Sequence, residues 1–256
     1  MRTFSRVSGH FKKLSLLLIA VTAQFALAQS HPPMETEADF HRAMDELSNW
    51  GRWGDEDELG AANLITPEKR KEAASLVQEG IVVSLAHDVN QEPAVDASAV
   101  LTREVLRVSP TGASDRYEYS GSYHGTIHSH LDALDCHIMY EGSGYNGVTY
   151  QQVEAAGGCP RGDINAHKDG IVTRGVLFDA TLLPGRATAD GWLEPGTAIN
   201  YDDLLALEEI QGVRVEPGDV ILLYTGRWKR REALGAWPTS EGVAGYHADV
   251  AYFLQE

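Results

Sequence analysis

The sequence predicts an α/β fold, a single mixed-sheet domain in which strands predominate around a cluster of histidines. Aliphatic and β-branched runs at 170–183 and 220–224 are typical of buried strands. Segments with helix start and stop signals lie before, between and after them. The length of 256 residues, with 43% hydrophobic and 23% charged residues, suits one globular domain or at most two.

The first 28 residues predict an export signal that is not part of the domain. Four basic residues precede an apolar run at 14–28, which ends with the small residues Ala26 and Ala28. The run is shorter than the roughly 20 residues of a membrane span, so cleavage is favoured over anchoring. We therefore expect a mature domain at 29–256, periplasmic or secreted and not associated with a membrane.

The first part of the mature chain predicts two helices. Residues 29–60 are acidic and rich in Trp, Gly and Asp, which favours a short exposed helix followed by loops. The run Thr66-Pro67-Glu68 is typical of a helix start, because it provides a capping hydroxyl, a proline at the first helical position and an acid in the first turn. Gly80 is expected to end this helix.

Strand signals dominate the middle of the chain. The β-branched run 81–85 predicts a strand, and so do 100–108 and 116–130, which the turn formers at 109–112 separate. Residues 141–169 are rich in Gly, Asn and Asp and predict an ordered loop.

The last part of the chain alternates strands and helices. The strand at 170–183 precedes a helix from Asn200 to Gly212, which has two acids in its first turn. The strand at 220–224 follows a Pro-Gly turn, and residues 246–256 predict a final helix.

The charge balance excludes nucleic acid as a partner. The chain has 21 Lys and Arg against 37 Asp and Glu, a net charge of −16. Such a chain repels phosphate backbones, whose binding depends on clustered cations. The two cysteines, Cys136 and Cys159, are too few for a disulfide framework. An oxidising periplasm permits a bond between them, and the sequence leaves that pairing open.

The segment 123–137 carries the chemistry, since it holds four of the ten histidines together with Asp132. If the segment is a strand, alternate residues share a face, and His124, His128, His130 and Asp132 point the same way. Imidazoles and a carboxylate on one face suit Zn or Mn. The alternatives are a solvated histidine-rich face or histidines bonded to the backbone. A helix would rotate His130 away, so this prediction depends on the strand.

Several motifs of the mature chain, in their order, resemble those of the cyclase-like metal-dependent hydrolases, which include bacterial kynurenine formamidase and isatin hydrolase. The central one is His130-Leu131-Asp132-Ala133, which is similar to the family's His-x-Asp-Ala core. The others are Trp50-Gly51 with Asp57–Leu64, Tyr145-Asn146-Gly147, Thr173–Asp179, Pro217–Leu222 and Thr225-Gly226-Arg227-Trp228.

The resemblance implies the fold of the cyclase/kynurenine formamidase type and a divalent metal, Zn or Mn. It implies His130 and Asp132 as ligands, with His128 or His124 replacing the family's first histidine, whose position falls on Thr126. In another register His124, His128 and His130 take the three ligand positions. A histidine from the C-terminal region, His247, is expected to complete the ligand set.

The resemblance also implies an activity. We expect hydrolysis of an amide with a planar ring, N-formylkynurenine or a cyclic amide, by metal-activated water, with His137 as the acid/base. His137 stands one residue later than in the family motif, and Leu134 replaces its proline. The resemblance suggests a homodimer, and the family's usual length suggests that the chain is a C-terminal truncation.

Three further points stay open. Trp50, Trp53 and Tyr145 are candidates for an aromatic pocket, although core packing is the more frequent role of such residues. Arg174 is expected to pair with an acid, the alternative being a substrate carboxylate. The rival functions are a cupin-like metal-dependent oxygenase, based on His128-Ser129-His130, and a non-catalytic periplasmic metal-binding protein.

Overall fold

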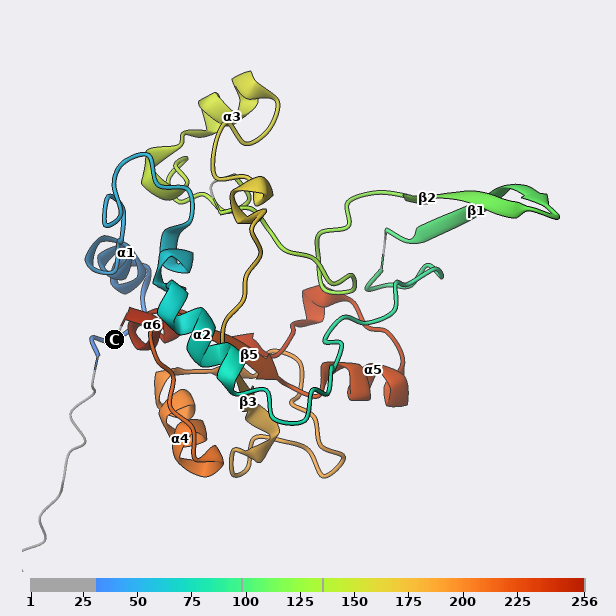
Figure 1. Ribbon diagram of the computed structural model, residues 1–256. Coiled ribbons are helices and arrows are strands. Elements are labelled where there is room, and N and C mark those ends of the chain that lie inside the picture. The colour runs from blue at the N-terminus through green and yellow to red at the C-terminus, as the bar shows by residue number, and fades with distance from the viewer. Residues whose placement is uncertain (1–30, 98, 135, 256) are drawn as a thin grey trace, which may run out of the picture. The chain divides into compact units, whose positions relative to one another are not determined.

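The computed structural model describes residues 31–97, 99–134 and 136–255. The chain divides into the units Met1–Pro32 and Pro33–Glu256, and the fold below is that of the second unit (Figure 1). The expected signal at 1–28 lies outside the described residues. Among the helices of the described ranges, none combines the length and apolar character required to cross a bilayer.

Helices and short strands alternate through the described residues. The α-helices are α1 (Glu37–Glu46), α2 (Pro67–Ser75), α3 (Tyr150–Ala156), α4 (Tyr201–Gln211), α5 (Arg227–Leu234) and α6 (Val250–Gln255). The strands are β1 (Leu101–Ser109), β2 (Gly112–Tyr119), β3 (Gly175–Asp179), β4 (Ala198–Ile199), β5 (Val220–Tyr224) and β6 (Gly245–Tyr246). The 3-10 helices are η1 (Gly60–Leu64), η2 (Tyr145–Gly147), η3 (Ile164–His167), η4 (Ala180–Leu182) and η5 (Thr239–Glu241).

The described strands form pairs and not the expected single mixed sheet. β1 and β2 are antiparallel, whereas β3 with β5 and β4 with β6 are parallel. The mixed α/β character is therefore confirmed, but the single sheet is wrong. The expected strand at 81–85 is also wrong, because these residues have no ladder partner and Val82 is 93% exposed. A β-branched run forms a strand only against a neighbour.

The predicted helix signals are confirmed at α2 and α4. The Thr66 hydroxyl accepts a hydrogen bond from the Lys69 amide, and α2 ends at Ser75, before Gly80. Asn200 and Asp203 form a capping box at the start of α4, and Gly212 ends it in the left-handed conformation. These contacts satisfy amides and carbonyls that a helix end leaves free.

The hydrophobic core lies where α4 and α6 pack near β3. Leu204 and Leu207 of α4 and Phe178 of β3 are fully buried. Phe253 of α6 meets Phe178 edge to face, with ring centroids 6.2 Å apart. Burying each such side chain stabilises the fold by about 1.5–3 kcal/mol. The alternate residues Val176 and Phe178 face this core, while Leu177 between them is 52% exposed.

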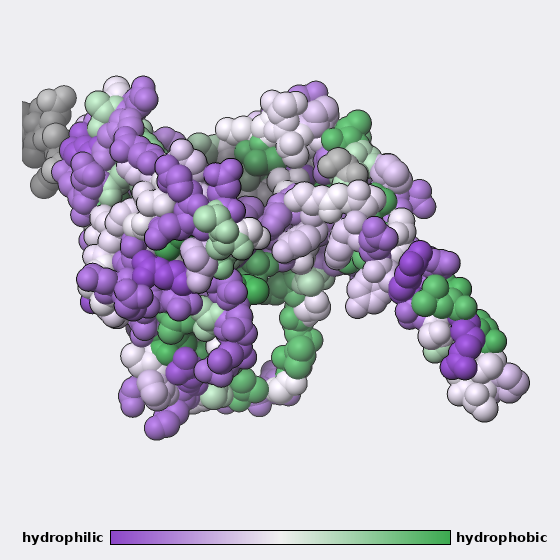
Figure 2. Space-filling model, turned by 90° about the horizontal axis from the view of Figure 1, so that it is seen from above, coloured by the Kyte–Doolittle hydropathy of each residue, from purple (hydrophilic) through white to green (hydrophobic). Residues whose placement is uncertain are grey.

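The hairpin of β1 and β2 turns at residues 109–112, as predicted, with Ser109 paired to Gly112. Nearly all its residues are exposed, and ion pairs such as Arg103–Asp115, at 2.6 Å, link the strands across the surface. Figure 2 shows hydrophobic and hydrophilic side chains both reaching the molecular surface on one face.

The strand expected at 116–130 ends at Tyr119, so the histidine segment is a loop. Strands therefore do not predominate around the histidines, which corrects the prediction. Gly121 follows the strand, and Gly125 has a φ of +132°, a conformation that breaks a regular strand. The interruption frees the histidine side chains from strict alternation.

A buried carboxylate joins α2, the residue before β3, and β5. The Asp219 side chain is 0% exposed and lies 2.9 Å from Lys69 Nζ and 2.5 Å from Arg174 Nη2. Arg174 thus pairs with an acid, as predicted. The adjacent Gly218 has a φ of +84°, and a Cβ there would lie 2.5 Å from the Leu64 carbonyl oxygen, so only glycine fits this turn.

The Asp219→Asn substitution is expected to lower the free energy of unfolding by about 3 kcal/mol, because it leaves two cations without their buried partner. The matched control is Asp115→Asn on the exposed hairpin, with an expected loss below about 1 kcal/mol. Urea unfolding at neutral pH measures both. Equal losses in the two variants would contradict the structural role of Asp219.

This difference is expected to depend on pH. Burial alone would raise the pKa of Asp219, but hydrogen bonds from Arg174 and Lys69 outweigh burial and lower the pKa below its ordinary value. A lowered folded-state pKa contributes stability that is present above the ordinary carboxyl pKa of about 4 and is lost as the pH falls through the folded value. The advantage of wild type over Asp219→Asn should therefore shrink in acid, and a constant advantage would contradict this origin.

Candidate metal centre

Asp132 is the centre of the histidine loop. Its Oδ1 lies 2.7 Å from His124 Nδ1 and 3.4 Å from His130 Nε2, and its Oδ2 lies 3.4 Å from His137 Nε2. The loop thus turns three imidazoles toward one carboxylate, although these residues span positions 124–137 of the chain.

Neighbouring contacts orient these rings. His130 Nδ1 lies 2.7 Å from the His128 carbonyl oxygen, which leaves Nε2 directed at Asp132. A backbone contact of this kind fixes the ring orientation of metal-binding histidines. His124 stacks on His137 with centroids 4.3 Å apart, and Tyr123 stacks on the same His124 at 4.5 Å. The rings are therefore held by packing as well as by Asp132.

The donor set fits a divalent cation. One ligand atom from each of His124, His130 and Asp132 lies within 4.8 Å of the other two. Two imidazoles and a carboxylate are ligands that Zn and related divalent metals accept, and three protein ligands leave a position for water. The side chains of His124 and Asp132 are 38% and 35% exposed, so the centre is open on one side.

His128 and His247 do not join this group, contrary to the expected ligand set. His128 is buried, and its Nε2 lies 2.7 Å from the Ala99 carbonyl oxygen, because the loop turns this residue inward. His247 follows β6 and lies 3.1 Å from Asp249. Of the two histidines that the resemblance offered as a replacement for the family's first ligand, His124 and not His128 lies beside His130 and Asp132.

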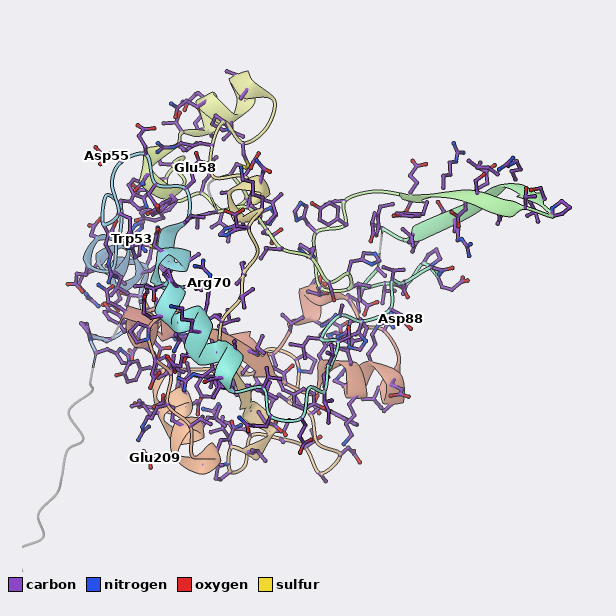
Figure 3. All side chains as sticks on the ribbon, viewed as in Figure 1. Trp53, Asp55, Glu58, Arg70, Asp88 and Glu209 are labelled. Carbon is purple, nitrogen blue, oxygen red and sulfur yellow. A yellow bond between two sulfur atoms is a disulfide. The ribbon has the colours of Figure 1, made fainter. Side chains whose placement is uncertain are left out.

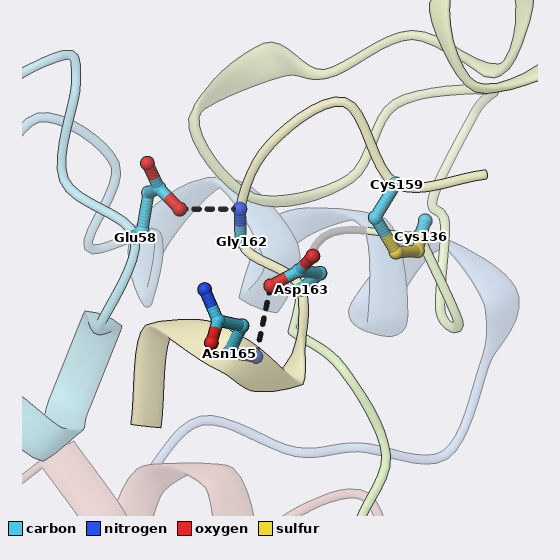
Figure 4. The surroundings of a disulfide bond; sticks show 6 residues. All are labelled: Glu58, Cys136, Cys159, Gly162, Asp163 and Asn165. Atoms are coloured by element: carbon cyan, nitrogen blue, oxygen red, sulfur yellow. Dashed lines mark hydrogen bonds between the residues drawn. A yellow bond between two sulfur atoms is a disulfide. The ribbon is translucent and has the colours of Figure 1, made fainter. Parts of the chain in front are cut away.

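A disulfide joins Cys136 and Cys159 (Figure 4). It anchors the residue before His137 to the loop that follows α3. That loop is held in turn by Glu58, whose Oε2 accepts a hydrogen bond from the Gly162 amide at 2.9 Å. The labelled Glu58 lies on the segment leading into η1 (Figure 3). The disulfide that the sequence left open therefore supports one side of the histidine loop.

The start of α5 contacts the other side of the loop. Arg227 Nη2 donates to Thr126 Oγ1 at 2.9 Å. The ring of Trp228 packs against His87 in a tilted arrangement with centroids 3.9 Å apart, and the His87 amide donates to the Ser129 hydroxyl at 3.3 Å. In the sequence, Arg227 and Trp228 stand out only as part of a motif. Their contact with the loop depends on tertiary structure, and no local signal in the sequence reveals it.

Arginines surround a buried acid next to this contact. The Asp96 side chain is 0% exposed and accepts two hydrogen bonds from Arg231, at 2.8 and 3.0 Å. The Arg231 hydrogen bonds outweigh burial and lower the pKa of Asp96. The acid therefore stays charged at neutral pH and ties α5 to the segment before β1.

The candidate aromatic residues do not form one pocket. Trp50 lines a cavity of about 740 Å³ between α1, the start of α6 and residues 140–143. Tyr145 is buried and its hydroxyl donates to Asp57 at 2.9 Å, while Trp53 lies under the Arg52 guanidinium. The residues around Asp132 do not line this cavity.

Comparisons with known proteins identify one similar solved structure and one matching family. A search of curated proteins gave no match. A solved structure described as the crystal structure of a novel cyclase is similar, with 29% sequence identity and a TM-score of 0.68. The similarity covers 82% of this chain and 72% of that chain.

A family model described as "Putative cyclase" matches residues 83–256, which include the whole histidine loop. This match covers more than half of the 256 residues and confirms the resemblance seen in the sequence motifs. The chain belongs to the cyclase family.

Proposed function

We propose that the protein is a metal-dependent hydrolase of an amide bond, acting on an aryl formamide such as N-formylkynurenine or on a cyclic amide. The observation that carries this proposal is the convergence of His124, His130 and His137 on Asp132. Membership of the cyclase family supports enzymatic function. We further propose a periplasmic or secreted location after cleavage at residue 28, and a homodimer.

We propose that His124, His130 and Asp132 hold the cation, Zn or Mn. A bound divalent cation lowers the pKa of water to near neutrality and polarises a carbonyl oxygen. The Asp132 carboxylate supplies negative charge and aligns the imidazoles around it. The open side of the group, where His124 and Asp132 are partly exposed, admits a substrate carbonyl.

His137 is suited to move the proton. Its Nε2 lies 3.4 Å from Asp132 Oδ2, and its ring stacks on His124. An imidazole held in this way accepts a proton from the attacking water and donates it to the leaving nitrogen of the amide. The amide bond then breaks, giving a carboxylic acid and an amine.

The geometry does not favour a cupin-like oxygenase. That function requires His128 and His130 to converge on one metal, whereas His128 Nε2 contacts the Ala99 carbonyl oxygen. A non-catalytic metal-binding protein differs from the proposed hydrolase only in turnover, so an assay of formamide hydrolysis separates the two functions.

The ligand set predicts different metal binding in matched histidine variants. His124→Ala and Asp132→Ala should each weaken Zn or Mn binding at least tenfold, because each removes a ligand. His128→Ala should retain metal binding and lose stability instead, since its imidazole is buried against Ala99. Calorimetric titration of metal-free protein measures affinity, and circular dichroism checks the fold. Loss of metal binding in His128→Ala with retention in His124→Ala would contradict this ligand set and identify His128 as the ligand in place of His124.

The proposed reaction predicts turnover of N-formylkynurenine, followed by ultraviolet absorbance. Chelation should abolish turnover and added Zn or Mn should restore it. His137→Gln should lower kcat by about 10²- to 10⁴-fold, the usual contribution of a general acid/base, with metal binding retained. Metal binding without turnover of any formamide or cyclic amide would favour the non-catalytic alternative.

A further inference from the structure

The arginines of α5 differ in how their charges are compensated. Arg231 makes two hydrogen bonds to Asp96, and Arg230 Nε lies 3.6 Å from Glu194. Among the described residues, no carboxylate lies within hydrogen-bond distance of the Arg227 guanidinium, since its Nη2 is 3.7 Å from Asp96. Each of the two Asp96 oxygens already accepts from Arg231.

Arg227 is also poorly solvated. Its side chain is 16% exposed, and Nε and Nη1 are buried without a hydrogen-bond partner among the described residues. The guanidinium lies over the Trp237 ring, 4.5 Å from its centroid. Burial lowers the pKa of Arg227, and Arg231 and Arg230 add to this, against the opposing effect of Asp96. An anionic ligand would compensate this charge.

The guanidinium lies beside the candidate metal centre. Its Nη2 donates to the hydroxyl of Thr126, an exposed residue two positions after His124 in the loop. Two residues of chain span at most about 7 Å. The contact of His87 with both Trp228 and Ser129 holds α5 against the same loop independently. A small molecule bound at the metal centre therefore has Arg227 and Thr126 within reach.

We propose that Arg227, together with the Thr126 hydroxyl, binds a carboxylate of the substrate. This inference rests on the proposed amide hydrolysis and narrows its substrate class to amides that carry a carboxylate. A guanidinium provides fixed donors that match a carboxylate, and Thr126 adds a hydroxyl donor beside it. Arg174 is excluded from this role, because Asp219 occupies its Nε and Nη2.

The test compares two formamides in wild type and Arg227→Gln. N-formylkynurenine carries a carboxylate, whereas formanilide is a neutral aryl formamide. The substitution should raise KM for N-formylkynurenine by about 10- to 100-fold, the effect of losing a charged hydrogen bond, and leave formanilide unchanged. Arg230→Gln, which also removes a guanidinium from Trp237, is the matched control and should change neither KM. Equal effects of Arg227→Gln on both substrates would overturn the proposal.

A binding measurement separates this proposal from the proposed reaction. Kynurenine keeps the carboxylate and lacks the formyl group, so its calorimetric titration requires no turnover. Wild type should bind kynurenine, and Arg227→Gln should bind it at least tenfold more weakly. That result without turnover of any formamide would contradict the reaction and support the carboxylate site. Equal kynurenine binding by the two proteins would overturn the site even if turnover is found.

Thr126→Val keeps the test decisive if Arg227→Gln does not fold. It removes one exposed hydroxyl and leaves the guanidinium in place. A rise in KM confined to N-formylkynurenine supports the site, and an unchanged KM for both formamides counts against it.

Discussion

The buried Asp219 carboxylate is the constraint on which the packing of α2, β3 and β5 depends. Its charge is compensated only when two cations from different segments lie beside it. Lys69 of α2 and Arg174 before β3 both reach the residue that precedes β5. The parallel pairing of β3 with β5 begins beside this contact, and β3 contributes Val176 and Phe178 to the core that packs against α4. A lone buried charge is costly, so separating α2 or β3 from β5 would destabilise the fold.

The candidate centre depends on a second carboxylate, Asp132, in a loop that is fixed from three sides. β2 leads into the loop, the Cys136–Cys159 disulfide holds its end, and Arg227 contacts its middle through Thr126. Irregular backbone held in this way places three imidazoles around one acid without the alternation of a strand. Such a loop on a supported scaffold is a common location for binding groups.

Local signals made part of this structure predictable. Capping at Thr66 and Asn200, the turn at 109–112 and the aliphatic run at 220–224 each act over a few residues, and the structure confirms them. No strand forms at 81–85, and the strand predicted at 116–130 ends at Tyr119, because a strand depends on a distant partner. Histidine density and the His-x-Asp-Ala motif identified the segment of the candidate metal centre. The fold of the loop, which the motif does not determine, brings His124 and not His128 to His130 and Asp132. The contact between Arg227 and Thr126 joins residues 101 positions apart, so no pattern in the sequence marks it.

We expect Asp132 and its surrounding histidines to bind a divalent metal. The most direct test is anomalous X-ray diffraction from crystals grown with Zn, measured on both sides of the zinc absorption edge. We expect an edge-dependent peak between His124, His130 and Asp132, with His137 beside it. A peak at His128 or His247 instead, or no peak at Asp132 at saturating Zn, would contradict it.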